Sequence, residues 1–177
     1  MKSKKWLILV SLVIMCLMLS GCFFSEQKIA IDEKGEAEIS ITFWFEKSLA
    51  ENEGAIAIQN LLFSFPELQT NYEFKEETKE DYVCFTFKAK EKVDINQNKY
   101  ITFIKREDGS YYFEAKIPKV VEEESEQNEK ALTIKLTLPA EIDMANSMNY
   151  EGRTVEWELR TNNFAKDIIL KAFTKTL

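Results

Sequence analysis

The amino-acid sequence of 177 residues contains no histidine. Histidine is the most frequent general acid or base in enzymes and a common metal ligand, so its absence excludes Ser-His and Cys-His catalysis and most zinc sites. Carboxylates are numerous, but none lies in a recognisable catalytic motif, and a glycosidase-type pair is defined by a geometry that sequence does not give. We therefore predict a protein that is not an enzyme and that has no cofactor and no metal site.

Cysteine and clusters of basic residues are also scarce. Of the three cysteines, Cys16 and Cys22 lie in or directly after an apolar N-terminal segment. Cys84 then remains alone in the rest of the chain, so no intramolecular disulfide is available. The formal net charge is −7, and an acidic chain without Lys/Arg clusters is not suited to nucleic acid or to broad attraction by an anionic bilayer. We expect no nucleic-acid partner.

The N-terminus has the pattern of a secretory signal. Three lysines precede an apolar run from Trp6 to Leu19, and the small residues Ser20 and Gly21 follow. The run is 14 residues long, shorter than the roughly 17–25 residues that a membrane-spanning helix needs. This length favours a cleaved signal over the alternative, a transmembrane anchor that is never cut.

Cys22 follows this small pair directly, so that Leu19-Ser20-Gly21-Cys22 resembles the lipobox of bacterial lipoproteins. The resemblance implies cleavage between Gly21 and Cys22, diacylglycerol on the thiol of Cys22, and a location on the extracytoplasmic face of the cell membrane. Loss of the three lysines changes the net charge from −7 to −10. The expected organisation is a signal peptide at 1–21, a lipidated short tether at 22–26 and a single domain at 27–177.

Alternation of apolar and polar residues predicts β-strands along most of the remaining chain. A first hairpin has strands around Ile29 and from Ala37 to Phe45, joined by a turn in which Gly35 can take a positive φ. Asp108-Gly109 marks another hairpin. The sequence therefore predicts an α+β fold, with an antiparallel β-sheet of about eight strands built from hairpins and packed by one main helix. Further strands are expected near 72–74, 83–89, 101–103, 111–117, 132–138 and 155–159, with a turn at 76–81 and a strand or short helix within 167–177.

One segment has helical periodicity. Ser48 followed by Glu51 is typical of a capping box, and Pro66 ends a helix that we predict from about Ser48 to Ser64. Four apolar residues fall at i, i+3, i+4 and i+7 on one face: Ile58, Leu61, Leu62 and Phe65. This face either lines a cavity for an apolar ligand or packs directly against the sheet.

Three other features have structural interpretations. The charged run from Glu122 to Lys130 lacks the spaced carboxylates and turn glycine of a calcium loop, so we expect a solvated loop. Cys84 is interpreted as a small residue on the second face of its strand, because a reactive thiol needs a cationic or helix-terminal setting. Trp157 is expected on the buried face of its strand, together with Val155 and Leu159.

Several motifs together resemble the LppM-like family of bacterial lipoproteins, much of which is known only as a domain of unknown function. They are the lipobox, Asp32-x-x-Gly35, Leu136-Thr137-Leu138-Pro139, and the segment Gly152-Arg153-Thr154-Val155-Glu156-Trp157-Glu158-Leu159. The resemblance implies an antiparallel sheet packed by helices, and a link to the binding of envelope lipids or glycolipids.

These observations give two hypotheses of function. The favoured one is a non-enzymatic envelope lipoprotein, anchored to the membrane through Cys22, that binds a lipid or another apolar ligand. The alternative is a scaffold or assembly partner of another membrane or envelope protein. A bound small molecule would distinguish the two.

Overall fold

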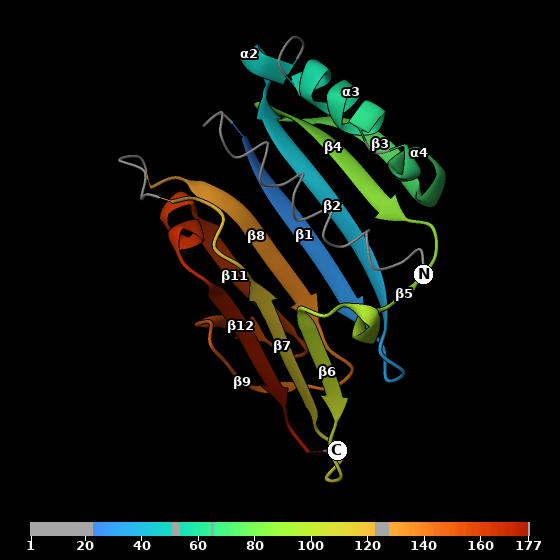
Figure 1. Ribbon diagram of the computed structural model, residues 1–177, viewed down its shortest axis with the longest axis vertical. Coiled ribbons are helices and arrows are strands. Elements are labelled where there is room, and N and C mark those ends of the chain that lie inside the picture. The colour runs from blue at the N-terminus through green and yellow to red at the C-terminus, as the bar shows by residue number, and fades with distance from the viewer. Residues whose placement is uncertain (1–22, 51–53, 65, 123–127, 177) are drawn as a thin grey trace.

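The computed structural model describes residues 23–50, 54–64, 66–122 and 128–176 (Figure 1). The signal peptide predicted at 1–21, the cleavage site at Gly21 and the lipid attachment residue Cys22 lie outside this range. Most of the described chain forms two β-sheets, as the alternating sequence pattern predicts.

Eight strands form the larger sheet. Its order is β10-β11-β8-β1-β2-β4-β3, and β5 pairs with β2. The strands are β1 (Phe23–Ile31), β2 (Glu36–Glu46), β3 (Tyr72–Lys79), β4 (Tyr82–Ala89), β5 (Val93–Asp94), β8 (Lys130–Thr137), β10 (Asn149–Glu151) and β11 (Thr154–Arg160).

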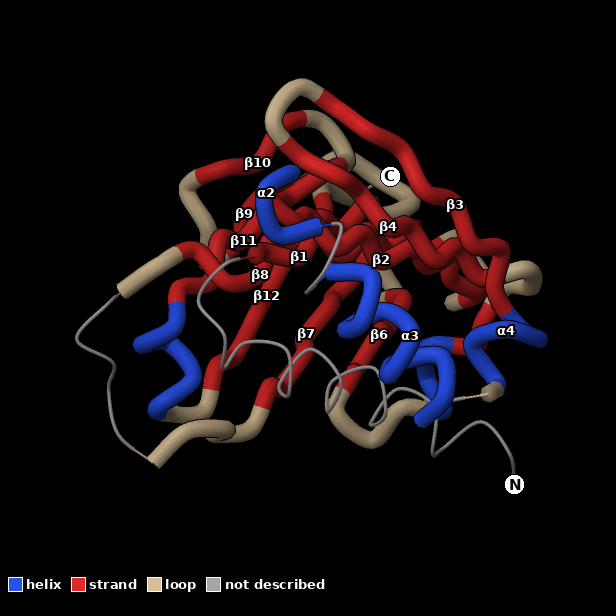
Figure 2. Tube along the Cα trace, turned by 90° about the horizontal axis from the view of Figure 1, so that it is seen from above, coloured by secondary structure: helices blue, strands red, loops and turns tan. Residues whose placement is uncertain are grey.

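Four strands form the smaller sheet, in the order β6-β7-β12-β9. They are β6 (Ile101–Lys105), β7 (Tyr111–Ile117), β9 (Ile142–Ala145) and β12 (Ile168–Thr174). The helices are short: α2 (Lys47–Leu49), α3 (Ala55–Ser64), α4 (Glu67–Asn71), and the 3-10 helices η3 (Ile95–Gln97) and η4 (Thr161–Ala165). The smaller sheet covers one half of one face of the larger sheet, and α3 and α4 lie over the other half of that face (Figure 2).

The predicted sheet of about eight antiparallel strands with one main helix is right in its β-rich character and wrong in detail. The described residues contain twelve strands in two sheets. Three of them, β5, β9 and β10, are only two to four residues long, too short to show a clear alternation. In addition, β1 and β8 are parallel, with Ser25 opposite Leu132. Parallel neighbours need a long crossover, so no local signal in the sequence indicates this pair.

The turn predicted at 76–81 is also wrong, because β3 continues to Lys79. The turn is confined to Glu80 and Asp81, and Glu80 has a positive φ of 46°. The charged residues before this turn belong to β3 itself, where Lys75 Nζ lies 2.6 Å from Glu77 Oε1. An edge strand that carries charges in this way resists pairing with other chains. Charge alone therefore does not mark a loop here.

The two predicted glycine turns are confirmed. Gly35 has a φ of 82°, and Gly109 has a φ of 83°. In the first turn, the backbone N–H of Lys34 donates to Asp32 Oδ1 over 2.9 Å. A Cβ atom on Gly35 would lie 2.8 Å from Asn96 Nδ2, so a side chain there would displace the Asn96 amide, and the positive φ independently favours glycine at this position.

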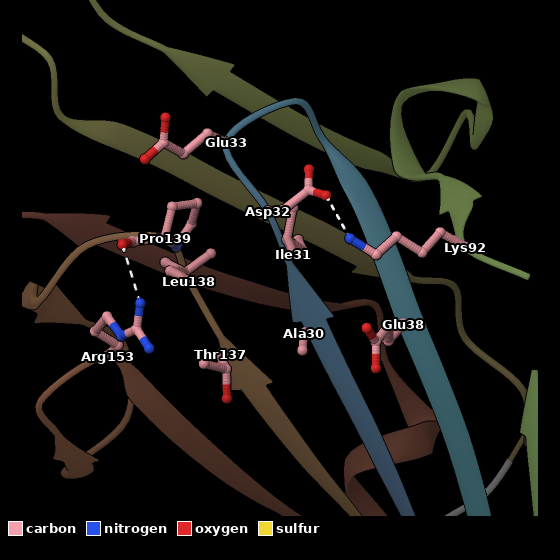
Figure 3. A pocket seen from close by; sticks show the side chains of 10 residues that line it. All are labelled: Ala30, Ile31, Asp32, Glu33, Glu38, Lys92, Thr137, Leu138, Pro139 and Arg153. Carbon is pink, nitrogen blue, oxygen red and sulfur yellow. Dashed lines mark hydrogen bonds and ion pairs between the residues drawn. The ribbon is translucent and has the colours of Figure 1, made fainter.

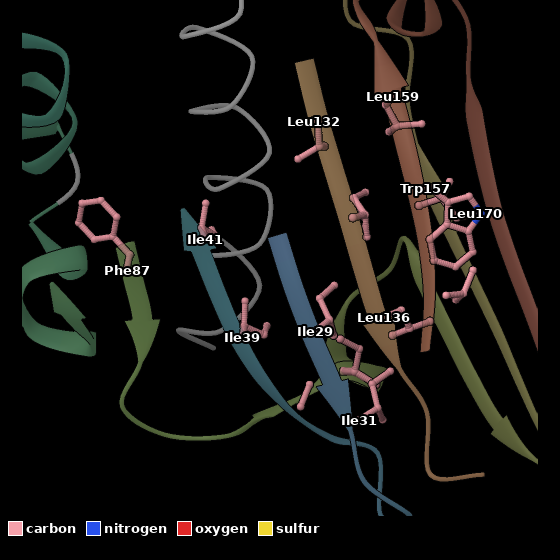
Figure 4. Close-up of a cluster of buried hydrophobic side chains, with 14 of the residues drawn as sticks. Ile29, Ile31, Ile39, Ile41, Phe87, Leu132, Leu136, Trp157, Leu159 and Leu170 are labelled. Atoms are coloured by element: carbon pink, nitrogen blue, oxygen red, sulfur yellow. The ribbon is translucent and has the colours of Figure 1, made fainter. Parts of the chain in front are cut away.

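The core lies between the two sheets and beneath α3 and α4 (Figure 4). Trp157 is buried as predicted, with 5% of its surface exposed, and Val155 and Leu159 are buried beside it. Odd-numbered residues of β2 point inward, from Ala37 to Phe45, while even-numbered residues are half-buried or exposed. This is the period of two that the sequence shows.

Tyr111 places a polar hydroxyl group inside this core. Its side chain is fully buried and stacks on Phe103, with ring centroids 5.4 Å apart. Its hydroxyl has no hydrogen-bond partner among the described residues. A buried polar group without a partner costs about 1–3 kcal/mol, so Tyr111→Phe should raise the free energy of unfolding by an amount of this order. Urea denaturation with an unchanged m-value measures it.

Tyr112→Phe is the matched control for Tyr111→Phe. The Tyr112 hydroxyl donates to Glu114 Oε2 over 2.5 Å, so its removal should lower the stability or leave it unchanged. A less stable Tyr111→Phe variant would contradict the prediction and would mean that the Tyr111 hydroxyl is satisfied in solution.

Candidate functional site

The end of the larger sheet nearest to Cys22 is the first candidate site. The tether predicted at 22–26 is wrong as a separate segment, because β1 begins at Phe23. In the register of β1 with β2, Phe23 lies opposite Phe45 and Phe24 opposite Trp44. The chain leaves β2 at Glu46 and enters α2 directly. A lipid on Cys22 would therefore lie one residue from the start of β1, at the end of the sheet where β2 leads into α2. We call this end of the larger sheet the anchor end.

Three aromatic side chains gather at the anchor end. Phe24 stacks on Trp44 with centroids 5.5 Å apart, and Tyr82 meets both rings edge-on, at 5.8 Å and 6.1 Å. Lysines lie over two of the rings: Lys79 Nζ is 5.4 Å from the Trp44 centroid and Lys130 Nζ is 5.2 Å from the Phe24 centroid. These residues come from five strands, and sequence reasoning missed the cluster because only the pairing order brings them together.

The predicted ligand face lies on α3, and its residues differ in how deeply they are buried. Ile58 and Leu61 are 4% and 6% exposed and belong to the continuous core, and Leu62 is partly buried against it. Phe65 lies outside the described residues. The structure thus brings Ile58 and Leu61 together over the sheet, the arrangement that both interpretations of this face require.

The helix predicted from Ser48 to Ser64 is found in part, since both ends of it are helical and residues 51–53 lie outside the described part of the chain. Ser48 lies inside the three-residue α2, which has no side-chain cap, and α3 begins only at Ala55. Glu51, the partner in the predicted capping box, lies outside the described residues. Gly54 precedes α3 and packs on the Phe45 ring, where an added Cβ would lie 3.1 Å from Cγ. This close approach attaches the start of α3 to the anchor end of β2.

The opposite side of α3 is apolar and exposed. Ile56 is 57% exposed and Phe63 is 87% exposed. None of the ten residues of α3 carries a charge, in a chain in which 30% of residues are charged. Sequence reasoning missed this second face because it used the i, i+3, i+4 pattern of the buried face alone; the absence of charge over ten residues was the available signal.

A polar pocket of about 280 Å³ lies at the other end of the larger sheet, beside the β1–β2 turn (Figure 3). Lys92 Nζ donates to Asp32 Oδ2 over 2.8 Å. This bond holds the pKa of Asp32 below its ordinary value and raises the pKa of Lys92. Arg153 Nη1 lies 3.5 Å from the Pro139 carbonyl oxygen. Asp32, Lys92 and Arg153 are thus held by bonds within the pocket wall, while Glu33 and Glu38 complete its lining. We assign the pocket no activity.

Cys84 is a structural residue in this arrangement. It is 1% exposed, and burial raises the pKa of its thiol. A high pKa disfavours the thiolate, which is the reactive form. In the part of the chain that the structure describes, no three potential metal ligands lie together, and no helix is long and apolar enough to cross a membrane.

The outer face of the smaller sheet carries an apolar row across its four strands. Phe173 lies opposite both Met144 and Tyr112, and Tyr112 lies opposite Ile104. Ile104 and Met144 are 49% and 55% exposed. Beside this row, hydrogen bonds from Tyr112 and Lys171 lower the pKa of Glu114 to about 2. The row is a second surface on which a protein partner could bind.

Comparisons with known proteins give a similarity in structure but none in sequence families. No protein-family model matches the chain, and no curated protein matches it. The chain is similar to the NMR structure of the folded domain of LppM from Mycobacterium tuberculosis, with a TM-score of 0.49, 10% sequence identity, and coverage of 88% of this chain and 90% of that one.

Proposed function

We propose that the protein is a non-enzymatic lipoprotein of the bacterial envelope, held on the extracytoplasmic face of the membrane by a diacylglyceryl group on Cys22, and that it binds a lipid or another apolar ligand. The observation that carries the proposal is the position of β1, which begins one residue after Cys22. An acyl group at that residue keeps the fold, and α3 with it, beside a reservoir of lipid at high effective concentration.

The ligand would enter between α3 and the larger sheet. Only two of the ten residues of α3, Ile58 and Leu61, are buried. Each fully buried apolar side chain contributes about 1.5–3 kcal/mol. The two buried side chains of α3 therefore contribute only a small part of the free energy that comes from burial of the whole apolar core. Weakly held elements are the ones that open for ligands. An apolar molecule can thus replace the contacts of Ile58 and Leu61 with little loss.

Leu61→Trp tests this entry site in a chain of residues 23–177. If α3 opens for a ligand, the larger side chain should fill the space, reduce the uptake of a fluorescent fatty acid several-fold and leave the melting temperature nearly unchanged. In a closed core the same change should cost about 1–3 kcal/mol by overpacking. The measurements are a fluorescence titration and a thermal melt of the same sample.

Gln59→Trp provides the control, because Gln59 is on the same helix but is exposed. It should alter neither uptake nor stability. Failure of the parent chain to take up any apolar probe, together with marked destabilisation by Leu61→Trp, would rule out the ligand site.

A scaffold is the second candidate function, and the apolar row on the smaller sheet favours it. The row joins Ile104, Tyr112, Phe173 and Met144 on the face turned away from the core. Side chains of this kind, set beside charged neighbours, are typical of protein interaction sites. Native mass spectrometry of the purified protein separates the candidates: a bound apolar molecule supports ligand binding, and a stoichiometric protein partner supports the scaffold.

A further inference from the structure

We propose that the exposed side of α3, defined by Ile56 and Phe63, docks into the surface of the bilayer that holds the acyl chains of Cys22. This inference rests on the proposed lipid anchor and adds a second, non-covalent membrane contact to it. It also fixes which side of the fold faces the membrane.

The chemistry of α3 fits a membrane surface. Phe63 is 87% exposed and Ile56 is 57% exposed, and the helix has no acidic or basic side chain at all. Large apolar side chains gain free energy when they leave water, while a charge in the same position would oppose entry into the bilayer. An exposed helix in an acidic protein normally carries charges on its solvent side, so their absence here is specific to this element.

The spacing places the two apolar residues on one side. Ile56 and Phe63 are seven positions apart, close to two helical turns of 3.6 residues each. Gln59 and Asn60 lie between them and are exposed and uncharged. Interfacial helices bury their apolar face roughly 5–10 Å into the region between headgroups and acyl chains. At that depth Ile56 and Phe63 would contact acyl chains, and the two amides would stay among the headgroups.

The position of α3 identifies the bilayer as the occupant of this surface. The backbone before α3 packs on Phe45 through Gly54, and Phe45 lies opposite Phe23, the residue that follows Cys22. The helix therefore starts at the anchor end of the sheet (Figure 1). The tryptophan and tyrosine of the aromatic cluster lie at the same end, and these two residue types are enriched where proteins meet the membrane surface.

A protein partner fits this surface less well. A stable interface buries roughly 800 Å² on each side, and α3 offers two large side chains on fewer than three turns of helix. A bilayer needs no complementary shape, and the lipid on Cys22 already brings it into contact. The uncharged helix needs no attraction by charged headgroups, so docking should also occur on phosphatidylcholine, a zwitterionic lipid with no net charge.

The test uses the acylated protein, produced from the full chain and reconstituted in phosphatidylcholine vesicles. An environment-sensitive fluorophore is attached at Phe63→Cys, at Ile56→Cys, or at the control Met148→Cys. Met148 is also apolar and fully exposed, but it lies between β9 and β10, and β10 is at the edge of the larger sheet opposite to β3, the strand that follows α4. Cys84 is 1% exposed and should not react in the folded protein.

Phosphatidylcholine brominated near the top of its acyl chains should quench the fluorophore strongly at positions 56 and 63 and leave position 148 unquenched. Absence of quenching at 56 and 63, or equal quenching at all three positions, would overturn the docking proposal. The mass of each sample reports independently on acylation. A mass without acyl chains would refute the anchor, and the docking of α3 would still be decided by the quenching at position 63.

Discussion

Trp157→Ala should lower the free energy of unfolding by about 3–5 kcal/mol, the usual cost of removing a large buried aromatic side chain. Trp157 is 5% exposed and lies in the core between the sheets, where its ring stacks near Phe113 with centroids 6.5 Å apart. The change would open a cavity in the middle of the core. This loss is a large fraction of the roughly 5–15 kcal/mol by which domains are stable, so the variant should melt well below the parent.

Trp157 also joins the two sheets through a hydrogen bond. Its Nε1–H donates to Asn146 Oδ1 over 3.0 Å. The same oxygen accepts from the backbone N–H of Lys171 in β12 over 2.7 Å, and Asn146 Nδ2 donates to the Ile169 carbonyl over 2.6 Å. Asn146 therefore connects the larger sheet to β12 of the smaller one.

Two matched variants separate packing from hydrogen bonding. Trp157→Phe keeps a buried ring but loses the indole donor, and Asn146→Ala removes the acceptor but leaves the core filled. Trp157→Phe also removes some buried volume, and Asn146→Ala also loses the two bonds to β12. The double-mutant cycle removes these separate costs and should leave a coupling energy of about 0.5–1.5 kcal/mol for the shared bond. Chemical denaturation of the four proteins measures this. A Trp157→Ala variant that melts within a degree or two of the parent would contradict the burial of this side chain.

Trp157 also illustrates what the sequence predicts well. Its burial follows from the alternation of Val155, Trp157 and Leu159 with polar residues, a pattern that a half-buried strand imposes locally. The turns at Gly35 and Gly109 were equally predictable, because only glycine takes a positive φ without strain. In each case the signal and the structure that it predicts lie within a few residues.

The features that sequence reasoning missed depend on contacts between distant segments. The parallel pairing of Ser25 with Leu132 decides which strands neighbour β1, and it has no local signature. The aromatic cluster depends on the order β1-β2-β4, since Phe24, Trp44 and Tyr82 lie on these three neighbouring strands. The packing of Gly54 against Phe45 is likewise a contact that the helical pattern of Ile58, Leu61 and Leu62 does not reveal.

Removal of the thiol at position 22 should have the largest effect on how the protein is held in the cell. Cys22→Ser should abolish acylation, because the thiol is the atom that would carry diacylglycerol. Each buried methylene contributes about 0.8 kcal/mol, so one acyl chain binds marginally and two anchor a protein stably. Incorporation of radiolabelled palmitate should fall to background in the variant. Palmitate on the serine variant would refute the lipobox interpretation.

Membrane fractionation alone would not suffice as the measurement for Cys22→Ser. A precursor that retains Trp6–Leu19 can stay in the membrane through that apolar run, so the mass of the intact protein must be determined. The parent should have residues 22–177 and the acyl chains, whereas the variant should retain all 177 residues without them. Cys84→Ala is the control: its thiol is 1% exposed, so acylation and cleavage should be unchanged.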